Sequence, residues 1–122
     1  MEKDTIRHII NYLRQATITW PGRSACINRH SKKFNVGKYK NGKVKFKKKV
    51  ECQKCFEWFD QKNIEVDHIE EVGPFKGDWN EYISRLFCSQ DNLQPLCIKC
   101  HSRKTSQFNA TLTFKRKKYS EL

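Results

Sequence analysis

Residues 96–105 read LCIKCHSRKT, which places Cys97 and Cys100 three positions apart and His101 directly after them. By itself, Cys-x-x-Cys-His is the attachment signature of a c-type haem, and it is equally half of a zinc site followed by a free histidine. The N-terminal MEKDTIRHII is charged and contains no apolar run of signal-peptide length, so we expect a cytoplasmic protein with reduced thiols. That expectation disfavours haem, as does the lack of a methionine after Met1 to serve as an axial ligand.

A second Cys-x-x-Cys pair, CQKC, lies at residues 52–55, with 41 residues between the two pairs. Two such pairs are the usual supply of ligands for a tetrahedral four-cysteine zinc site, although a redox pair is an alternative. The sequence therefore predicts a structural zinc ion whose binding energy is part of the folding energy. Its expected ligands are Cys52, Cys55, Cys97 and Cys100. Cys26 and Cys88 stand alone and are expected to be buried thiols.

Charge is distributed unevenly along the chain. The formal net charge is +12, with 14 Lys/Arg against 2 Asp/Glu in residues 1–50, 4 against 10 in residues 51–96, and 7 against 1 in residues 97–122. An acidic middle between basic arms suits carboxylates grouped around a cation and flanks that bind a polyanion, for which nucleic acid is the first candidate. The lysine runs at residues 47–49 and 115–118 strengthen this interpretation over that of a merely solvated surface.

Hydrophobic periodicity predicts three helices. The first covers residues 4–14, where four aliphatic side chains share one face, with Asp4 or Thr5 as the cap and TWPGRS at residues 19–24 ending it. The second covers residues 78–87, with Asp78 as N-cap, Glu81 at the capping-box position and its aromatic side chains in the core. The third begins near Cys97 and runs through IKCHSRKT.

The strand signals complete an α+β fold. Residues 36–50, VGKYKNGKVKFKKKV, predict a lysine-covered β-hairpin with Asn41-Gly42 as a two-residue turn. A short strand is expected to start near Ile64 and to end in Asp67-His68. We expect one compact domain, in which residues 1–50 form a basic helix-and-hairpin extension, residues 51–106 the core, and residues 107–122 a basic C-terminal tail.

An adjacent carboxylate and imidazole at a strand end suit metal-assisted hydrolysis. The carboxylate of Asp67 would hold a hard divalent ion, and neutral His68 would take a proton from water. Alone, the pair would be interpreted as a satisfied turn. However, Asn92 lies nine residues before His101, and Lys104 follows, so the chemistry-bearing residues come in a definite order between and after the cysteine pairs.

The segments CQKC, VDHI, DNLQPLC and CIKCHSRKT, taken together, resemble the HNH endonucleases, specifically the zinc-containing branch with the ββα-metal fold. The matching residues span 52–105, and the chain is similar in size to standalone bacteriophage HNH proteins, which would act in the host cytoplasm. The resemblance implies an HNH nuclease core with His68 as general base and Asn92 as the residue that holds the loop between the strands. It also implies that His101 and Asp67 bind the catalytic ion.

Three further expectations concern the surroundings of this core. Because a histidine ligand suits borderline metals, the catalytic ion is expected to be Mg²⁺, Mn²⁺ or another divalent transition metal. Glu65, Glu70 and Glu71 are expected to be solvated or to support the ligands rather than to be ligands themselves. Phe56 departs from the resemblance, since many such zinc knuckles carry a small residue after the second cysteine.

Duplex DNA is the expected partner. Basic side chains would neutralise its phosphates without reading bases, so specificity would be weak or supplied by a partner protein. The candidate contacts are Lys47, Lys48, Lys49, Lys104, Lys115, Arg116 and Lys117. The sequence thus predicts a metal-dependent DNA endonuclease that cuts one strand at a time. The alternative is a non-catalytic zinc-ribbon DNA-binding module in which Asp67, His68 and His101 are incidental.

Overall fold

The structure is a computed structural model that describes the backbone of residues 1–120 and the side chains of residues 1–111. It confirms the predicted α+β class. The helices are α1 (Lys3–Ala16), α2 (Pro21–Arg29), α3 (Trp79–Leu86) and α4 (Ile98–Ser120). The strands are β1 (Ser31–Lys38), β2 (Val44–Glu51), β3 (Trp58–Asp60), β4 (Ile64–His68) and β5 (Leu93–Cys97), with 3-10 turns at Gln61–Asn63 and Gln90–Asn92.

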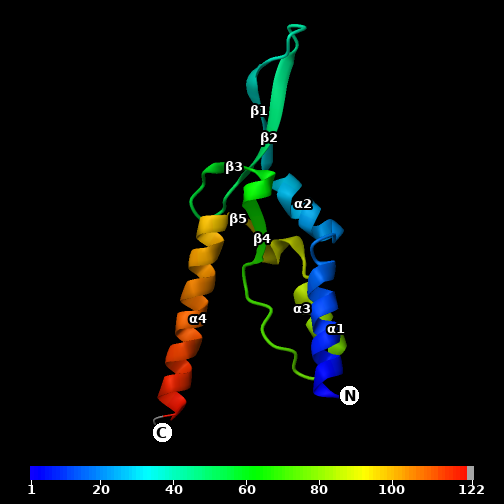
Figure 1. Ribbon diagram of the computed structural model, residues 1–122, viewed down its shortest axis with the longest axis vertical. Helices are drawn as coiled ribbons and strands as arrows, with labels where there is room; N and C mark the ends of the chain where they lie inside the picture. Colours follow the sequence, from blue (N-terminus) through cyan, green and yellow to red (C-terminus); the bar gives the residue numbers. More distant parts are fainter. Residues whose placement is uncertain (121–122) are drawn as a thin grey trace.

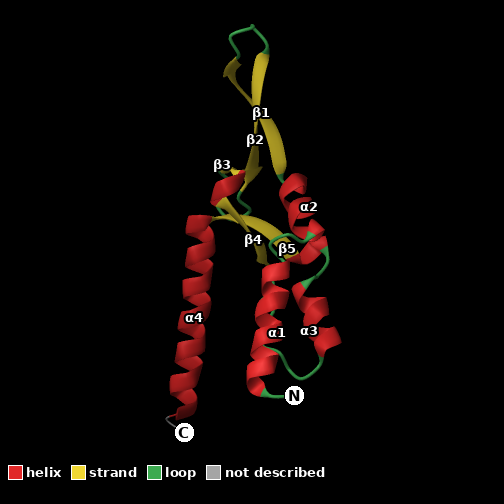
Figure 2. Ribbon diagram, turned by 45° about the vertical axis from the view of Figure 1, so that its right-hand side comes forward, coloured by secondary structure: helices red, strands yellow, loops and turns green. Residues whose placement is uncertain are grey.

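Two antiparallel sheets organise these elements. β1, β2 and β3 form a three-stranded sheet in that order, and β4 pairs with β5 in a separate two-stranded sheet. The β1–β2 hairpin projects from one end of the molecule, while both termini lie at the other end (Figure 1). α4 and α1 descend from opposite sides of the β4–β5 pair, and α3 lies beside α1 (Figure 2). The β4–β5–α4 unit is therefore the ββα arrangement expected from the sequence.

The main core lies where the two sheets and α2 meet. Its buried members include Ile27 of α2, Val50 of β2, Ile64 of β4 and Leu96 of β5, together with three cysteines discussed below. This position explains a helix that the sequence did not predict, because TWPGRS was interpreted only as a break. Pro21 is tolerated in the first turn of a helix, where its missing N–H has no intrahelical partner, so a residue that was interpreted as a helix breaker begins α2.

α1 packs through half-buried side chains, and none of its residues is fully buried. Its tie to α3 is a hydrogen bond from Arg14 Nε to the hydroxyl of the fully buried Tyr82, at 3.2 Å. The expected cap was wrong. Glu2 occupies the N-cap position without a side-chain bond, and Asp4 lies in the first turn, where its charge favours the positive end of the helix dipole.

The turn of the hairpin also differs from the expected two-residue turn. Tyr39 N donates to Lys43 O at 2.9 Å, and Gly42 N donates to Tyr39 O at 3.0 Å, so the loop covers residues 39–43. Gly42 has a φ of +84°, and Asn41 Oδ1 accepts a hydrogen bond from Lys43 N at 3.0 Å. Asn41 and Gly42 thus make the turn as expected, but in a longer loop in which the asparagine side chain replaces one backbone partner.

The remaining helices bear directly on the predicted boundaries. Asp78 caps α3 as expected, accepting from Asn80 N at 2.9 Å and Glu81 N at 3.3 Å, while the Glu81 carboxylate pairs with Arg85 at 3.3 Å. α4 runs without interruption across residue 107, where the basic tail was expected to start.

In the described part of the chain, the helices include none long and apolar enough to cross a membrane.

Candidate active site

The four cysteines of the predicted zinc site come together. Their Sγ atoms all lie within 4.8 Å of one another, and three of the residues are buried while Cys55 is exposed. Burial raises the pKa of the Cys52 thiol, but backbone N–H groups of Cys55, Cys97 and Lys54 outweigh it and lower the pKa to about 6. Four sulfurs at this spacing match the donor set of structural zinc, so the cluster could hold that ion.

Phe56 closes the turn of the first cysteine pair in an unusual backbone conformation. Its φ is +60°, the one positive φ among the described residues other than glycine, and its side chain is 64% exposed. The conformation lets Phe56 N donate to Cys52 O at 2.8 Å. Glycine and small residues are favoured in the left-handed conformation. This preference explains why many such zinc knuckles carry a small residue at the position that Phe56 occupies.

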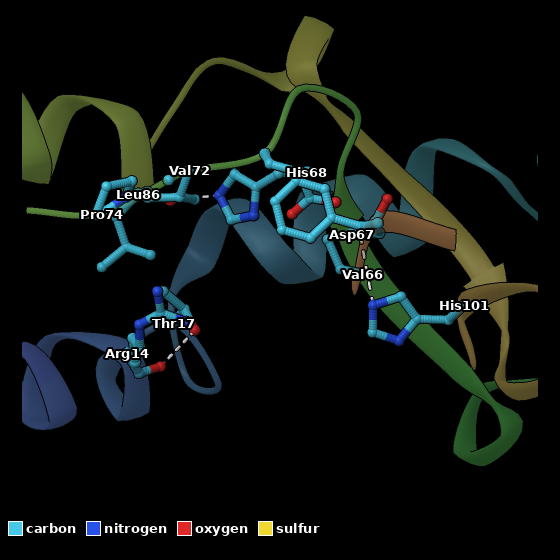
Figure 3. A pocket seen from close by; sticks show the side chains of 12 residues that line it. Arg14, Thr17, Val66, Asp67, His68, Val72, Pro74, Leu86 and His101 are labelled. Atoms are coloured by element: carbon cyan, nitrogen blue, oxygen red, sulfur yellow. Dashed lines mark hydrogen bonds and ion pairs between the residues drawn. The ribbon is translucent and has the colours of Figure 1, made fainter. Parts of the chain in front are cut away.

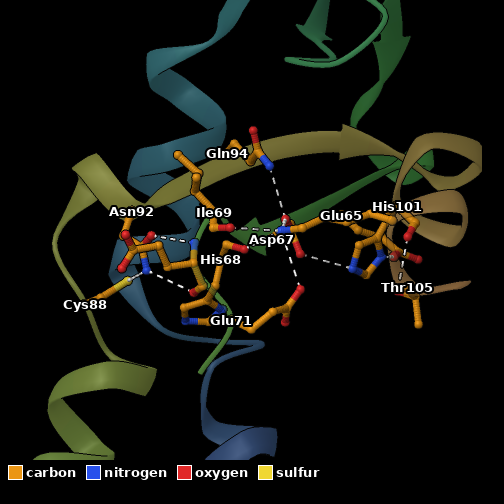
Figure 4. Close-up of polar contacts among 12 residues, drawn as sticks. Glu65, Asp67, His68, Ile69, Glu71, Cys88, Asn92, Gln94, His101 and Thr105 are labelled. Carbon is orange, nitrogen blue, oxygen red and sulfur yellow. Dashed lines mark hydrogen bonds and ion pairs between the residues drawn. The ribbon is translucent and has the colours of Figure 1, made fainter. Parts of the chain in front are cut away.

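Asp67 lies at the end of β4 with its side chain directed toward α4 (Figure 4). The residue is 6% exposed, and its two oxygens have different partners. Oδ1 lies 3.4 Å from His101 Nε2, while Oδ2 accepts from Gln94 Nε2 at 3.1 Å and from Lys104 Nζ. Gln94 faces Asp67 because the two are paired across the β4–β5 ladder. One oxygen is therefore held by the protein, and the other is directed at the histidine.

His101 is oriented by a second carboxylate. Its Nδ1 is hydrogen-bonded to Glu65 Oε2, and Glu65 precedes Asp67 by two residues on β4, so both carboxylates lie on the same face of the strand. Because a carboxylate accepts, Nδ1–H donates and the neutral ring carries its lone pair on Nε2, facing Asp67. A ring nitrogen that donates to a carboxylate while the other faces the ion is the usual arrangement of a metal-binding histidine.

The distance between the donor atoms of Asp67 and His101 is suitable for binding one divalent ion. Two ligand atoms each about 2.1 Å from one ion, at an angle of about 90–110°, lie roughly 3.0–3.4 Å apart. The distance from Oδ1 to Nε2 is 3.4 Å, and both atoms are acceptors once Nδ1 is protonated. Among the described residues, the four cysteines are the one group of three or more potential metal ligands, and the Asp67–His101 pair offers two donor atoms.

His68 lies beside this pair in a cavity of about 640 Å³ (Figure 3). Its Nε2 is 2.8 Å from the carbonyl oxygen of Leu86, at the end of α3. A carbonyl can only accept, so Nε2–H donates and the lone pair of the neutral ring is on Nδ1. The cavity is also lined by Arg14 of α1 and by His101 and Phe108 of α4.

Asn92 joins the loop after β4 to the turn before β5. Its Oδ1 accepts from Glu70 N at 2.8 Å, and its Nδ2 donates to Glu70 O at 3.3 Å. Its backbone carbonyl also accepts from Ile69 N at 2.8 Å, and Nδ2 lies 3.8 Å from Cys88 Sγ. These bonds immobilise the chain directly after His68.

Lys104 is placed differently from the expected DNA contact. Its ammonium group donates to Asp67 Oδ2, to His68 O at 2.6 Å and to Ile69 O at 3.2 Å. An ammonium has three N–H donors, so this side chain is fully used within the protein. It clamps the end of β4 to α4 and neutralises part of the Asp67 charge, while its side chain remains 29% exposed.

The lysine run at residues 47–49 is divided between the two faces of the hairpin, because side chains alternate along a strand. Lys47 pairs with Asp60 at 3.0 Å, and Lys48 is hydrogen-bonded to Asn28 Oδ1. Lys49 lies over the ring of Phe34, 5.8 Å from its centroid. The side chains of Lys115, Arg116 and Lys117 lie outside those that the structure describes.

Sequence reasoning did not anticipate all of the site. For Glu65 the sequence left open either solvation or support of a ligand, and its bond to His101 Nδ1 is the second of these. Gln94 could have been placed only by knowing the register of β4 and β5. Arg14 had no sequence signal, since it reaches the cavity from a helix that is far away in the chain.

Comparisons with known proteins found one similar protein among those searched. No family model matches the chain, and no solved structure matches it. The chain is 39% identical over 66 residues to a probable HNH endonuclease of Lactococcus phage SK1. The match covers 53% of this chain and 64% of the phage protein. This similarity supports an HNH-like family for the matched part of the chain.

Proposed function

We propose that the chain is a metal-dependent DNA endonuclease of the HNH type, which hydrolyses phosphodiester bonds. One observation carries the proposal: Asp67 Oδ1 and His101 Nε2 lie 3.4 Å apart beside the cavity that contains His68. A candidate base and a candidate ion site therefore open onto the same space. The name of the phage relative supports the same reaction class.

His68 would act as the general base. Its Nε2–H is held by the Leu86 carbonyl, so its unprotonated Nδ1 is free to take a proton from a water molecule. This hydrogen bond fixes the tautomer and the orientation of the neutral imidazole before substrate arrives. Positioned general bases typically contribute about 10²–10⁴-fold to the rate.

Asp67 and His101 would hold the divalent ion. When bound, such an ion stabilises the negative charge that develops on the phosphate and on the leaving oxygen. Gln94 and Lys104 keep Asp67 in one rotamer through Oδ2, and Glu65 keeps His101 turned through Nδ1. The protein thereby presents Oδ1 and Nε2 without further rearrangement.

The four-cysteine cluster and Asn92 would support this geometry rather than take part in the reaction. Zinc on the cysteines would fix the start of α4, and hence His101, relative to β5. Asn92 would hold the loop that follows His68. Products with 5′-phosphate and 3′-hydroxyl ends are expected, with one strand cut at each visit to the single site.

Supercoiled plasmid tests the proposal. Zinc-loaded protein should convert the plasmid to relaxed circles on addition of Mg²⁺ or Mn²⁺, and should leave it supercoiled when no second ion is added. Zinc content is measured in both samples, so that loss of the structural ion is not mistaken for loss of the catalytic one. Tight plasmid binding without cleavage under every ion condition would instead favour the non-catalytic zinc-ribbon module.

A further inference from the structure

The outer half of the β1–β2 hairpin, residues 36–46, is surrounded by solvent in the structure (Figure 1). Every residue in this segment is exposed, and we refer to it as the distal ribbon. The whole hairpin, residues 31–50, contains nine lysines and no aspartate or glutamate. Since two-stranded hairpins are marginal in water, a projecting hairpin of this charge needs a stabilising explanation.

The pairing of β1 with β2 places like charges opposite one another. Lys32 lies directly opposite Lys49, and Lys33 lies opposite Lys48, so two successive cross-strand pairs bring like charges together. Like charges placed directly opposite one another destabilise a strand pair. These pairs lie at the base of the hairpin, outside residues 36–46, so the register shows that positive charge extends along the whole hairpin, which favours an anionic partner.

The lysines of the hairpin are not equivalent. Near the base, Lys47 is paired with Asp60 and Lys48 is bonded to Asn28, so part of their charge is satisfied inside the molecule. In the distal ribbon, Lys38, Lys40 and Lys43 have no hydrogen bond or ion pair with any side chain described in residues 1–111. Lys45 lies over the ring of Tyr39, 5.6 Å from its centroid. The distal ribbon therefore carries several lysines whose charge is available to a partner.

Apolar side chains accompany these lysines. Tyr39 is 53% exposed, Val44 is 41% exposed and Phe46 is 59% exposed. The two asparagines of the hairpin are used locally, since Asn35 Oδ1 accepts from Gly37 N and Asn41 Oδ1 accepts from Lys43 N, each at 3.0 Å. The distal ribbon thus offers charge and apolar surface, with no arginine or glutamine and with the amide oxygen of its one asparagine already used within the turn.

We propose that the distal ribbon inserts into a groove of duplex DNA as a sequence-independent anchor, separate from the catalytic cavity. Two-stranded ribbons fit the major groove, which is about 12 Å wide, with lysines reaching phosphates on its rims and apolar side chains lying against the bases. The inference rests on the proposed function only for the choice of DNA as the polyanion. It assigns the anchoring role to the tip rather than to the lysine run at residues 47–49.

A binding experiment with matched charge removal tests the assignment. The full zinc-loaded chain is titrated, without a second ion so that no cleavage occurs, against a fluorescent duplex and against one of its single strands over a range of salt. The distal variant carries glutamine at Lys38, Lys40, Lys43 and Lys45. The control carries glutamine at four exposed lysines elsewhere, Lys3, Lys62, Lys76 and Lys99.

The distal variant should flatten the slope of log K against log salt by about 0.9 for each phosphate that is no longer neutralised, hence by up to about 3.6. The control should change the slope by less than half as much. Equal changes of slope in the two variants would mean that only net charge matters and would overturn the proposal. Tighter binding to the single strand than to the duplex would also overturn it, in favour of base stacking on the exposed rings.

Hydrogen exchange of backbone amides shows which segment of the chain is covered when DNA is bound. Backbone amides of residues 36–46 should become protected when duplex is added, because bound DNA would cover the distal ribbon and shield these amides from solvent. Protection by vesicles containing phosphatidylserine, with none by duplex, would contradict the proposal and indicate a membrane surface. These results do not depend on cleavage, so a failure of the endonuclease proposal in the plasmid assay would leave them interpretable.

Discussion

Asp67 Oδ1 lies 3.4 Å from His101 Nε2, and the other polar atom of each side chain is hydrogen-bonded to a further residue. Gln94 and Lys104 bind the second oxygen of Asp67, and Glu65 binds the second nitrogen of His101. In the neutral ring with its proton on Nδ1, the two facing atoms are both acceptors. A cation between them relieves that opposition, which is why the surrounding hydrogen bonds can be tested through ion affinity.

Glu65→Ala should weaken divalent-ion binding by about 10–100-fold, the usual effect of removing the partner of a ligating histidine. Glu65→Gln should retain more affinity, since the amide oxygen can still accept from Nδ1–H. Calorimetric titration of zinc-loaded protein with Mn²⁺ measures both. Glu70→Ala serves as the control, because the Glu70 contacts to Asn92 are made by its backbone. An equal weakening in Glu65→Ala and Glu70→Ala would show that only local negative charge matters.

Lys104→Met should have opposite effects on stability and on ion binding. The ion-free protein should lose about 1.5–3 kcal/mol, the typical value of a hydrogen bond to a charged group, because Asp67 loses its ammonium partner. Affinity for Mn²⁺ should rise, because a positive charge beside the site is removed. Lys76→Met removes the same charge from an exposed loop and should change neither quantity measurably. A fall in both stability and affinity would mean that Lys104 holds the ligands in place more than it competes with the ion.

Cys97→Ser should reduce bound zinc from about one ion per chain to almost none and abolish the cooperative melting transition, because the cysteines are part of the main core. Elemental analysis and thermal melting provide the two measurements. Cys88→Ser, a cysteine outside the cluster, should keep its zinc. A zinc-free Cys97→Ser protein that melts like the wild type would show that the cluster is not structural.

Phe56→Gly should stabilise the zinc-loaded protein by about 0.5–1 kcal/mol. Relief of the left-handed backbone is worth about 1–2 kcal/mol, and the greater freedom of glycine in the unfolded chain offsets part of it. Lys54→Gly, in the same turn with an ordinary φ, should be destabilising. Thermal melting distinguishes the two. If Phe56→Gly also destabilises, the exposed ring makes contacts worth more than the strain it imposes.

The elements that were anticipated correctly are those with local signals. Asp78 lies at a cap position that its own side chain satisfies, and the two Cys-x-x-Cys spacings require the chain to bring four sulfurs together. α2 was missed because Pro21 can act as a helix breaker or a helix starter, and only tertiary burial of Ile27 distinguishes the two. The longer hairpin loop depends on a side-chain bond from Asn41 that propensity does not capture.

The site was harder to anticipate than the fold. Asp67, His68 and His101 were singled out from their order and from the resemblance, but their partners depend on long-range geometry. Lys104 looked like one more surface lysine, whereas the turn of α4 directs it at the end of β4. Arg14 enters the cavity only because α1 packs on α3 through Tyr82.

Plasmid cleavage as a function of Mn²⁺ concentration, compared for wild type, His68→Ala and His101→Ala, tests the division of labour most directly. His68→Ala should lose at least about 10²-fold in rate at every ion concentration, because a missing base is not replaced by more metal. His101→Ala should bind Mn²⁺ weakly and recover part of its activity at high concentration, and both variants should retain zinc. Cleavage by His68→Ala at the wild-type rate, or loss of zinc from His101→Ala, would contradict the assignment of the two histidines.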